Sequence, residues 1–374
     1  MSSFASFNLL PSLQQTLNDK KYKVPTEIQV RAIPLLLDKQ SVVGVAETGS
    51  GKTLAYALPI LHMLKMLENE KNPVKIDGQP RALIIVPTRE LGEQVAKVFK
   101  IFTHSTRLRV RTILGGTKME VAKKNISGPF EILVVTPGRT IKLLDQRRLN
   151  LSDVRTLVFD EADQMLDEGF LSAAHKILEA CTTKPQMALF SATVSDAVQE
   201  LISELFSDVE VIRSGGSHRV PQSLTTVNRK VIDGKREPLL ENLLKEKAKG
   251  GTIIFTNTRE QCDKLALIIE GMGHKCTVYR GEMDKMERRN NLKSFREGKV
   301  DLLISTDLAS RGLDLEHVGR IINYHLPREI ENYLHRVGRT ARAGRSGVVF
   351  NFVTERDEPL VLKIEKSKAI GSKN

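Results

Sequence analysis

The sequence of 374 residues contains no tryptophan, few other aromatic residues and few cysteines. Aromatic residues make up 5% of the chain, which argues against binding nucleic acid by stacking bases on an aromatic platform. The three cysteines, Cys181, Cys262 and Cys276, are far apart and lack metal-ligand spacing. They indicate buried thiols in a reducing cytosol rather than a metal site.

Long hydrophobic segments are also absent. No apolar run reaches the length of a membrane-spanning helix, and the longest, at 54–64, contains Pro59 and His62 and indicates a buried helix. Residues 1–10 include no basic segment followed by an apolar core, so we expect no secretory signal. These observations predict a cytoplasmic protein without a membrane partner.

An excess of basic residues is the main compositional feature of the chain. The net charge of +12 predicts an anionic partner, most simply nucleic acid, although an anionic membrane surface would also attract it. Because aromatic residues are few, contact with the phosphate backbone is favoured. The hydrophobic content of 40% is typical of a globular protein, and the length suffices for two domains.

Continuous apolar runs of strand-forming residues alternate with helix-like stretches such as 91–102 and 170–180. This alternation indicates an α/β fold with parallel sheets that helices cover on both faces. The expected strands are 41–45, 82–86, 110–114, 132–136, 157–160, 187–191, 252–256, 276–280, 301–306, 320–324 and 348–353.

A polar segment at 214–221, with two glycines, serines and a proline but no apolar period, interrupts this pattern and indicates a linker. We therefore predict one α/β domain at 1–213 and a second at 222–366. Residues 367–374 form a short polar tail, which is too short for an RNA-specific module.

A glycine-rich segment follows the first expected strand and precedes an expected helix. Gly49 and Gly51 let the backbone wrap a phosphate, and the amides at the helix start point toward it. Lys52 would reach the terminal phosphates, and Thr53 would help to hold magnesium. The general pattern begins with glycine, where this chain has Ala46. A glycine-rich turn without a ligand is the alternative.

The segment just upstream offers groups that suit an adenine ring. The planar amide of Gln29 can bond the exchangeable edge of adenine twice, and Tyr22 can stack on the ring. Without the neighbouring glycine-rich segment, these residues would indicate only a helix start capped by Thr26.

Three carboxylates, Asp160, Glu161 and Asp163, follow another buried strand. Like charges resist burial, but a divalent cation and an attacking water would need such groups. A solvated acidic turn is the alternative. The hydroxyls of Ser191 and Thr193 end a further strand, and they would bond Asp163 or merely cap the next helix.

Short loops at 87–90, 115–116 and 136–139 also follow strands, where ligands of open α/β sheets usually bind. Their amides, hydroxyls and guanidiniums are groups that hold sugar-phosphate. Any one of them is more simply a turn. Three on one sheet edge of a basic protein predict a nucleic-acid track.

The second half carries Arg336, Arg339 and Arg342, which recur every three residues and would share one helix face. Three guanidiniums repel one another unless an anion neutralises them, and a γ-phosphate bound by the other domain would do so. A solvated basic helix is the alternative.

These motifs, in this order from Phe7 or Tyr22 to Arg342, resemble the DEAD-box ATP-dependent RNA helicases. The resemblance covers nearly the whole chain. It implies two tandem RecA-like domains, ATP and Mg²⁺ as cofactors, and single-stranded or duplex RNA held mainly by its backbone. It further implies a monomer whose protein adaptors supply specificity.

The resemblance also assigns a role to each matching residue. The catalytic set is Lys52, Asp160, Glu161, Arg339 and Arg342. The nucleotide-binding set is Tyr22, Gln29, Ala46, Glu47, Thr48, Gly49, Ser50, Gly51, Lys52, Thr53 and Asp314. Thr53 and Asp160 hold the metal, partly through water. The RNA-binding set is Arg89, Gly116, Thr136, Gly138, Arg139, Arg288 and Thr306, and the coupling set is Asp163, Ser191 and Thr193.

Four residues depart from the family pattern. Lys21 stands where glycine usually precedes the adenine-stacking aromatic residue, and Ala341 replaces a glycine between the two arginine fingers. Arg280 and Lys285 replace a usual His and Gln, which puts the detailed RNA contact there in doubt. None of the four belongs to the hydrolytic groups.

The implied mechanism is a two-domain clamp that ATP closes on one RNA strand and hydrolysis reopens. A bent strand in the closed groove would displace its complement. Three rival functions remain open: an ATP-gated RNA clamp or ribonucleoprotein assembly factor with little unwinding, a DNA translocase, and a small-molecule P-loop kinase. The kinase is the weakest, because it leaves the arginines and the strand-end loops unexplained.

Overall fold

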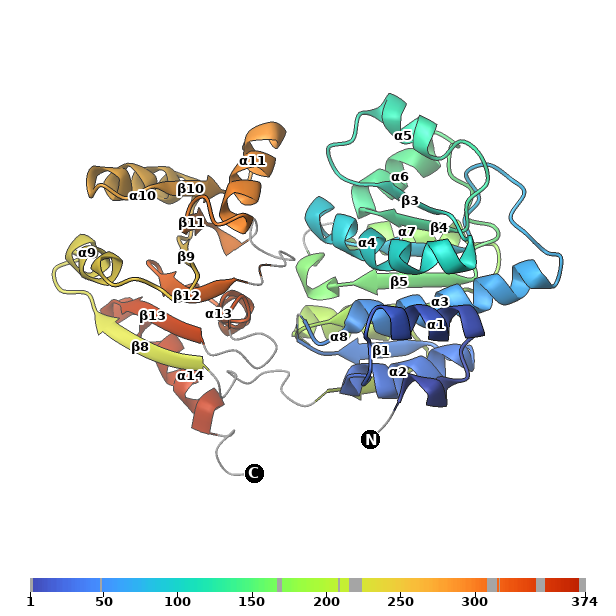
Figure 1. Ribbon diagram of the computed structural model, residues 1–374, viewed down its shortest axis with the longest axis horizontal. Coiled ribbons are helices and arrows are strands. Elements are labelled where there is room, and N and C mark those ends of the chain that lie inside the picture. Colours follow the sequence, from blue (N-terminus) through green and yellow to red (C-terminus); the bar gives the residue numbers. More distant parts are fainter. Residues whose placement is uncertain are drawn as a thin grey trace. The chain divides into compact units, whose positions relative to one another are not determined.

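The computed structural model describes residues 3–47, 49–166, 170–207, 209–214, 224–307, 315, 317–340 and 347–369. The chain divides into two compact units, Met1–Ser217 and His218–Asn374. Each unit is built around one parallel β-sheet (Figure 1). Among the described helices, none has the length and apolar character needed to cross a membrane.

The first unit contains a seven-stranded sheet in which all paired strands are parallel. Its strand order is β3 (Val110–Ile113), β4 (Ile132–Val135), β2 (Ala82–Ile85), β5 (Thr156–Asp160), β6 (Gln186–Ser191), β1 (Val42–Val45) and β7 (Glu210–Arg213). Each strand except β3 and β7 is buried along its full length, or nearly so, which explains its continuous apolar sequence.

Helices cover both faces of this sheet. Side chains of successive strand residues point to opposite faces, so Val42 enters one core and Val43 the other. The first core is closed by η1 (Phe4–Phe7), α1 (Pro11–Asp19), α2 (Glu27–Leu37), α3 (Lys52–Asn69) and α4 (Arg89–Thr106). The second is closed by α5 (Met119–Asn125), α6 (Pro137–Asp145), η2 (Ala162–Gln164), α7 (Phe170–Glu179) and α8 (Asp196–Leu205).

The second unit repeats this plan with a six-stranded parallel sheet. The strand order is β10 (Cys276–Tyr279), β11 (Leu302–Ser305), β9 (Gly251–Phe255), β12 (Val318–Asn323), β13 (Gly347–Val353) and β8 (Leu224–Lys230). The helices on one face are α9 (Glu237–Lys245) and α10 (Arg259–Gly271). Those on the other are α11 (Lys285–Arg296), α13 (Ile330–Val337) and α14 (Glu358–Ala369), which follows η4 (Glu355–Asp357).

The predicted α/β fold class is confirmed, and every expected strand is present with its bounds shifted by no more than two residues. Two strands, β7 and β8, were not predicted. Both lie at a sheet edge, where β7 buries only Ile212 and β8 only Leu224, so neither has the apolar run of a central strand. The expected buried helix at 54–64 lies within α3.

The predicted boundaries fall partly on residues that the structure does not describe. Apart from Ser214, the expected linker 214–221 lies outside the described residues. Helix α14 runs to Ala369 and so includes the first residues of the expected tail. All three cysteines carry free thiols, with Cys262 buried and the other two partly buried.

Candidate functional site

The glycine-rich segment forms the turn from β1 into α3, and its glycines have a structural reason to be there. Gly49 and Gly51 have φ angles of 89° and 92°, a region that favours glycine. A Cβ atom at Gly51 would lie only 2.4 Å from Nε2 of Gln29. Thr48, between them and the strand, lies outside the described residues.

Lys52 begins α3, and its side chain is buried, with 6% exposed. Its ammonium group donates to the carbonyl oxygen of Ala46 over 2.7 Å. Because an ammonium has three donors, this bond leaves it able to bind phosphate oxygens as well. In the same turn, Ser50 Oγ donates to the carbonyl of Glu47 over 2.6 Å. Burial raises the pKa of Glu47, against the opposing effect of the Lys52 charge.

Gln29 joins the start of α2 to the glycine-rich turn. Its Oε1 accepts from the Thr26 amide over 2.9 Å, and its Nε2 donates to the Gly51 carbonyl over 3.1 Å. The helix-cap alternative is confirmed, because Thr26 and Gln29 form a capping box. Tyr22 is 37% exposed. Lys21, before it, has a φ of 61°, which explains why glycine suits this position.

Asp160 ends β5 with 1% of its surface exposed. Its Oδ2 accepts from the Tyr56 hydroxyl over 2.7 Å, whereas Oδ1 is buried without a hydrogen-bond partner among the described residues. Burial raises the pKa of Asp160 to about 6, although the nearby Lys52 charge opposes this. A buried carboxylate oxygen with no donor is unfavourable on its own and suits a hydrated cation, so the donor set fits magnesium.

Glu161 follows in a left-handed backbone conformation, with φ 54° and ψ 52°, which costs a non-glycine residue about 1 kcal/mol. The residue is 2% exposed, and Gln164 Nε2 donates to its Oε2. Strain of this kind persists where the surrounding contacts hold it, and it is common at functional sites. Tyr56 was not predicted from the sequence, because only the fold brings its hydroxyl to the acidic pair. Gln164 was also missed, although its position three residues after Glu161 was a usable signal.

Asp163 links the acidic segment to the end of β6. Its Oδ2 accepts from the Ala192 amide, the Thr193 amide and the Thr193 hydroxyl, each over 3.1 Å. Ser191 does not contribute, because its hydroxyl donates to the Thr193 carbonyl over 2.8 Å. The helix-cap alternative is wrong for Ser191 and Thr193, since Ser195 caps α8.

The three strand-end loops meet at one sheet edge, because β3, β4 and β2 are neighbours. Arg89 donates to the Gly115 carbonyl over 3.5 Å, and its Nε also pairs with Glu93. Arg139 donates to the carbonyl of Thr117. The predicted RNA-binding residues of this unit are therefore brought together; they are Arg89, Gly116, Thr136, Gly138 and Arg139.

In the second unit, Arg288 lies on α11, and its guanidinium lies 4.7 Å from the centre of the ring of Tyr279, the last residue of β10. Thr306 directly follows the neighbouring strand β11. Arg280 forms an ion pair of 2.8 Å with Asp263 on α10. This pairing offsets the charge of Arg280, one of the two basic residues that depart from the family pattern in this segment.

The expectation that Arg336, Arg339 and Arg342 share one helix face is wrong. Helix α13 ends at Val337, so only Arg336 is helical, and Arg339 lies beyond the Gly338 cap. Arg339 is 1% exposed, and its Nε donates to the His335 carbonyl over 3.2 Å. Arg342 and Asp314 lie outside the described residues.

The anion that neutralises Arg336 belongs to the same unit. Arg336 is 1% exposed and forms two bonds with the Asp307 carboxylate, at 2.5 and 2.8 Å. Its other donors bond the side-chain oxygens of Asn257 and Asn323 and the carbonyl oxygen of His325. Sequence reasoning missed Asp307, although its position directly after the predicted RNA-binding Thr306 was a usable signal.

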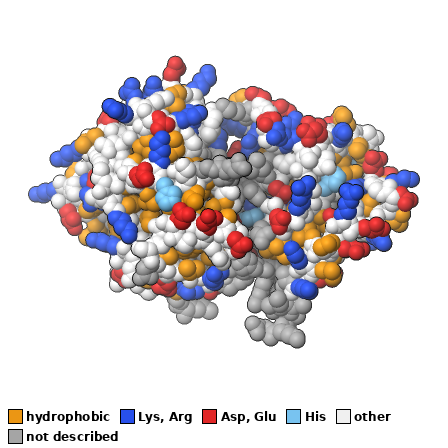
Figure 2. Space-filling model, turned by 180° about the vertical axis from the view of Figure 1, so that it is seen from behind, with side chains coloured by type: hydrophobic (Ala, Val, Ile, Leu, Met, Phe, Trp, Pro, Cys, Tyr) orange, Lys and Arg blue, Asp and Glu red, His pale blue; other side chains and the backbone are white. Residues whose placement is uncertain are grey.

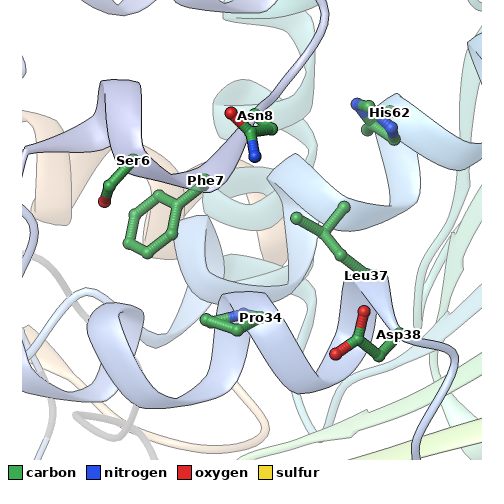
Figure 3. A pocket seen from close by; sticks show the side chains of 7 residues that line it. All are labelled: Ser6, Phe7, Asn8, Pro34, Leu37, Asp38 and His62. Carbon is green, nitrogen blue, oxygen red and sulfur yellow. The ribbon is translucent and has the colours of Figure 1, made fainter.

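Other surface features are less specific. On the face shown in Figure 2, Lys and Arg side chains are spread among acidic ones. A pocket of about 340 Å³ lies where η1 meets α2 and α3 (Figure 3). None of the predicted site residues lines it; its lining is Ser6, Phe7, Asn8, Pro34, Leu37, Asp38 and His62.

The family models that match are the DEAD/DEAH box helicase at residues 26–201 and the helicase conserved C-terminal domain at 234–344. ATP-dependent RNA helicase DeaD from Buchnera aphidicola is 35% identical over 98% of this chain and 60% of its own length. ATP-dependent RNA helicase RhlB from Shewanella sediminis is 35% identical over 94% of this chain and 81% of its own length.

Among solved structures, S. cerevisiae Dbp5 bound to RNA and ADP BeF3 matches with a TM-score of 0.85. It is 27% identical, and the match covers 98% of this chain and 93% of that one. Both units are thus RecA-like. The chain belongs to the DEAD-box family of ATP-dependent RNA helicases.

Proposed function

We propose that this chain is an RNA-dependent ATPase that separates short RNA duplexes. The observation that carries the proposal is the juxtaposition of Lys52, Asp160 and Glu161 at the ends of β1 and β5, beside a glycine-rich turn. Family membership supports RNA as the bound nucleic acid, since the relatives are named RNA helicases and the S. cerevisiae Dbp5 structure holds RNA and a nucleotide.

ATP is the substrate in this proposal. Tyr22 and Gln29 bind the adenine, and the turn from Ala46 to Gly51 surrounds the phosphates with backbone amides. Lys52 neutralises the charge on the terminal phosphates, and Asp314 contacts the ribose. Their roles follow from the chemistry of each side chain at its position.

The hydrolytic step uses the acidic pair. When bound, Mg²⁺ held by Thr53 and Asp160, partly through water, would draw charge from the phosphate oxygens. Glu161 orients the attacking water and accepts its proton as the new bond to the γ-phosphorus forms and ADP leaves. Arg339 and Arg342 stabilise the charge on the γ-phosphate in the transition state.

RNA is held through its sugar-phosphate backbone. The segments at the strand ends of each unit, together with Arg288 on α11, present guanidiniums, hydroxyls and amides; the residues are Arg89, Gly116, Thr136, Gly138, Arg139, Arg288 and Thr306. Asp163, Ser191 and Thr193 transmit changes at the acidic pair to the end of β6. Such contacts position the strand with little preference for its sequence.

The proposal includes a cytoplasmic monomer with separate domains at 1–213 and 222–366, joined by a linker at 214–221 and followed by a tail at 367–374. The proposal also includes protein adaptors that select the target RNA. The chain spans only 60% of the length of the Buchnera relative. The proposal therefore covers this chain and not the whole length of that relative.

The test compares ATP hydrolysis with RNA and with DNA oligonucleotides of the same sequence. We expect RNA to stimulate hydrolysis far more, since 2′-hydroxyl contacts distinguish the two, and a salt slope of about −0.7 per neutralised phosphate in RNA binding. Equal stimulation by DNA, or none by RNA, would contradict the proposal. RNA binding that depends on ATP but separates no strands would show that the chain is an ATP-gated RNA clamp and not a helicase.

A further inference from the structure

Tyr56 lies one turn after Lys52 in α3 and is fully buried. Its ring packs against Phe99 and Phe190, with centroid distances of 6.2 and 5.3 Å. A phenylalanine would fill this apolar space equally well. The hydroxyl therefore has a different role from the ring, and it is the hydroxyl that contacts Asp160, over 2.7 Å.

The hydroxyl contacts Asp160, one of the two residues that the proposed function assigns to the cation. It donates to Asp160 Oδ2 over 2.7 Å. Burial, followed by the charge of Asp160, raises the pKa of Tyr56 well above its usual value, so the phenol stays protonated and remains the donor. Oδ1 of Asp160 is then the carboxylate oxygen without a protein donor among the described residues.

We propose that Tyr56 is a positioning residue for the cation site, whose hydroxyl fixes the rotation of the Asp160 carboxylate so that Oδ1 serves the cation. This inference rests on the proposed function. Without the hydroxyl, the Asp160 carboxylate loses its hydrogen bond from a side chain and, with it, the contact that fixes its rotation. Removing such a partner of a metal-binding group typically lowers metal affinity 10–100-fold.

The experiment measures the affinity of Tyr56→Phe and of the wild type for a fluorescent ADP analogue, in EDTA and across a Mg²⁺ titration. We expect the affinity in EDTA to be unchanged. The Mg²⁺ concentration that gives half of the gain in affinity should rise about 10-fold in the variant. A purely structural role would alter binding in EDTA and thermal unfolding, but would leave the Mg²⁺ midpoint in place.

Tyr333→Phe is the matched control. Tyr333 is also fully buried, and its hydroxyl accepts from the Asn351 amide over 3.3 Å within the second unit. This variant loses a buried hydroxyl of the same kind. Its Mg²⁺ midpoint should equal that of the wild type.

The outcomes separate the two proposals. A wild type that binds the analogue without any effect of Mg²⁺ contradicts the proposed function. A normal Mg²⁺ effect in the wild type with an unshifted midpoint in Tyr56→Phe overturns the inference alone, and so does an equal loss of affinity with and without Mg²⁺.

A second measurement covers the case in which Tyr56→Phe fails to fold. The chain has five tyrosines, so fluorotyrosine labelling of the wild type gives a small set of fluorine resonances, and Tyr→Phe changes at the other four leave that of Tyr56 assigned. We expect this resonance to shift when Mg²⁺ is added to the ADP complex. An unmoved resonance would overturn the inference.

Discussion

The side-chain amide of Gln29 donates to the carbonyl oxygen of Gly51 over 3.1 Å and accepts from the amide of Thr26 over 2.9 Å. One side chain thus holds both the start of α2 and the glycine-rich turn. Because the amide keeps one N–H and one lone pair, it remains able to bond adenine. The residue proposed to bind the base therefore also shapes the turn proposed to bind the phosphates.

Gly51→Ala should damage this link. The added Cβ would lie 2.4 Å from Gln29 Nε2, and a φ of 92° is unfavourable for alanine. We expect nucleotide affinity to fall at least ~10-fold and the free energy of unfolding to fall by about 1 kcal/mol or more. Titration with a fluorescent nucleotide and thermal unfolding measure the two effects.

Gly271→Ala is the control for that change. Gly271 ends α10 and has no atom within 4 Å of the position of an added Cβ. Its affinity should match the wild type, and its stability should be equal or slightly higher. Wild-type nucleotide affinity in Gly51→Ala would show that the contact with Gln29 does not matter.

Thr193→Val should lower the coupling between hydrolysis and strand separation. The change removes the hydroxyl bond to Asp163, whereas the two backbone bonds to that carboxylate remain. We expect a loss of about 1 kcal/mol in stability, and a lower number of duplexes separated per ATP hydrolysed. Parallel ATPase and strand-displacement assays give this ratio.

Ser195→Ala provides the comparison for Thr193→Val. Ser195 caps α8 by accepting from the Val198 amide, so its loss costs about 1 kcal/mol at a nearby site without touching Asp163. The ratio of separation to hydrolysis should stay normal. If both variants separated the same number of duplexes per ATP hydrolysed, the coupling role of Thr193 would be refuted.

Asp307→Ala should destabilise the second unit strongly. It leaves the buried Arg336 guanidinium without its carboxylate, and breaking a buried pair costs on the order of 3 kcal/mol. Arg280→Ala breaks a partly exposed pair with Asp263, whose side chain is 51% exposed, and should cost less than about 1 kcal/mol. Calorimetry of both variants should show this difference. Equal unfolding temperatures would contradict a structural role for the Asp307 pair.

His325 should make the second unit less stable in acid. Burial, together with the charges of Arg236 and Arg336, lowers the pKa of this partly buried imidazole to about 4. Between pH 6.5 and 4 the unfolded chain binds a proton that the folded chain does not, so stability falls as pH falls. NMR titration should give a midpoint near 4. A midpoint near 6.5 would show that the folded chain does not lower the pKa of His325.

A variant isolates the contribution of this histidine to stability. His325→Gln removes the titrating group, so the stability of the wild type relative to the variant should fall on the order of 1 kcal/mol as the pH is lowered from 7 to 4.5. Because the ring is partly exposed, this loss of stability is smaller than a fully buried histidine would give. A difference that is independent of pH would show that burial does not hold the imidazole neutral.

Central strands were predictable because burial on both faces selects continuous apolar runs, as in β1 and β2. The edge strand β8 was not, because pairing through its backbone places few demands on its side chains. The glycine-rich turn was found because its spacing is local. The contact of Tyr56 with Asp160 joins residues 104 positions apart, so only the fold reveals it.

The arginine cluster shows how a local period misleads. The spacing of three suggested one helix face, but α13 stops at Val337 and Arg336 turns to Asp307. A sequence pattern places charges along the chain but does not identify their counter-ions. The site was therefore predictable where one loop supplies it, and poorly predictable where distant segments contribute.

The most direct test of the account is RNA-stimulated ATP hydrolysis by Glu161→Gln, measured beside nucleotide binding. Glu282→Gln is the control, because Glu282 is also a glutamate with positive φ, at 62°, but its side chain is 73% exposed and pairs with Arg259. We expect Glu161→Gln to bind nucleotide as the wild type does and to hydrolyse it at least ~100-fold more slowly, as loss of a general base predicts. Full turnover by Glu161→Gln would contradict the account.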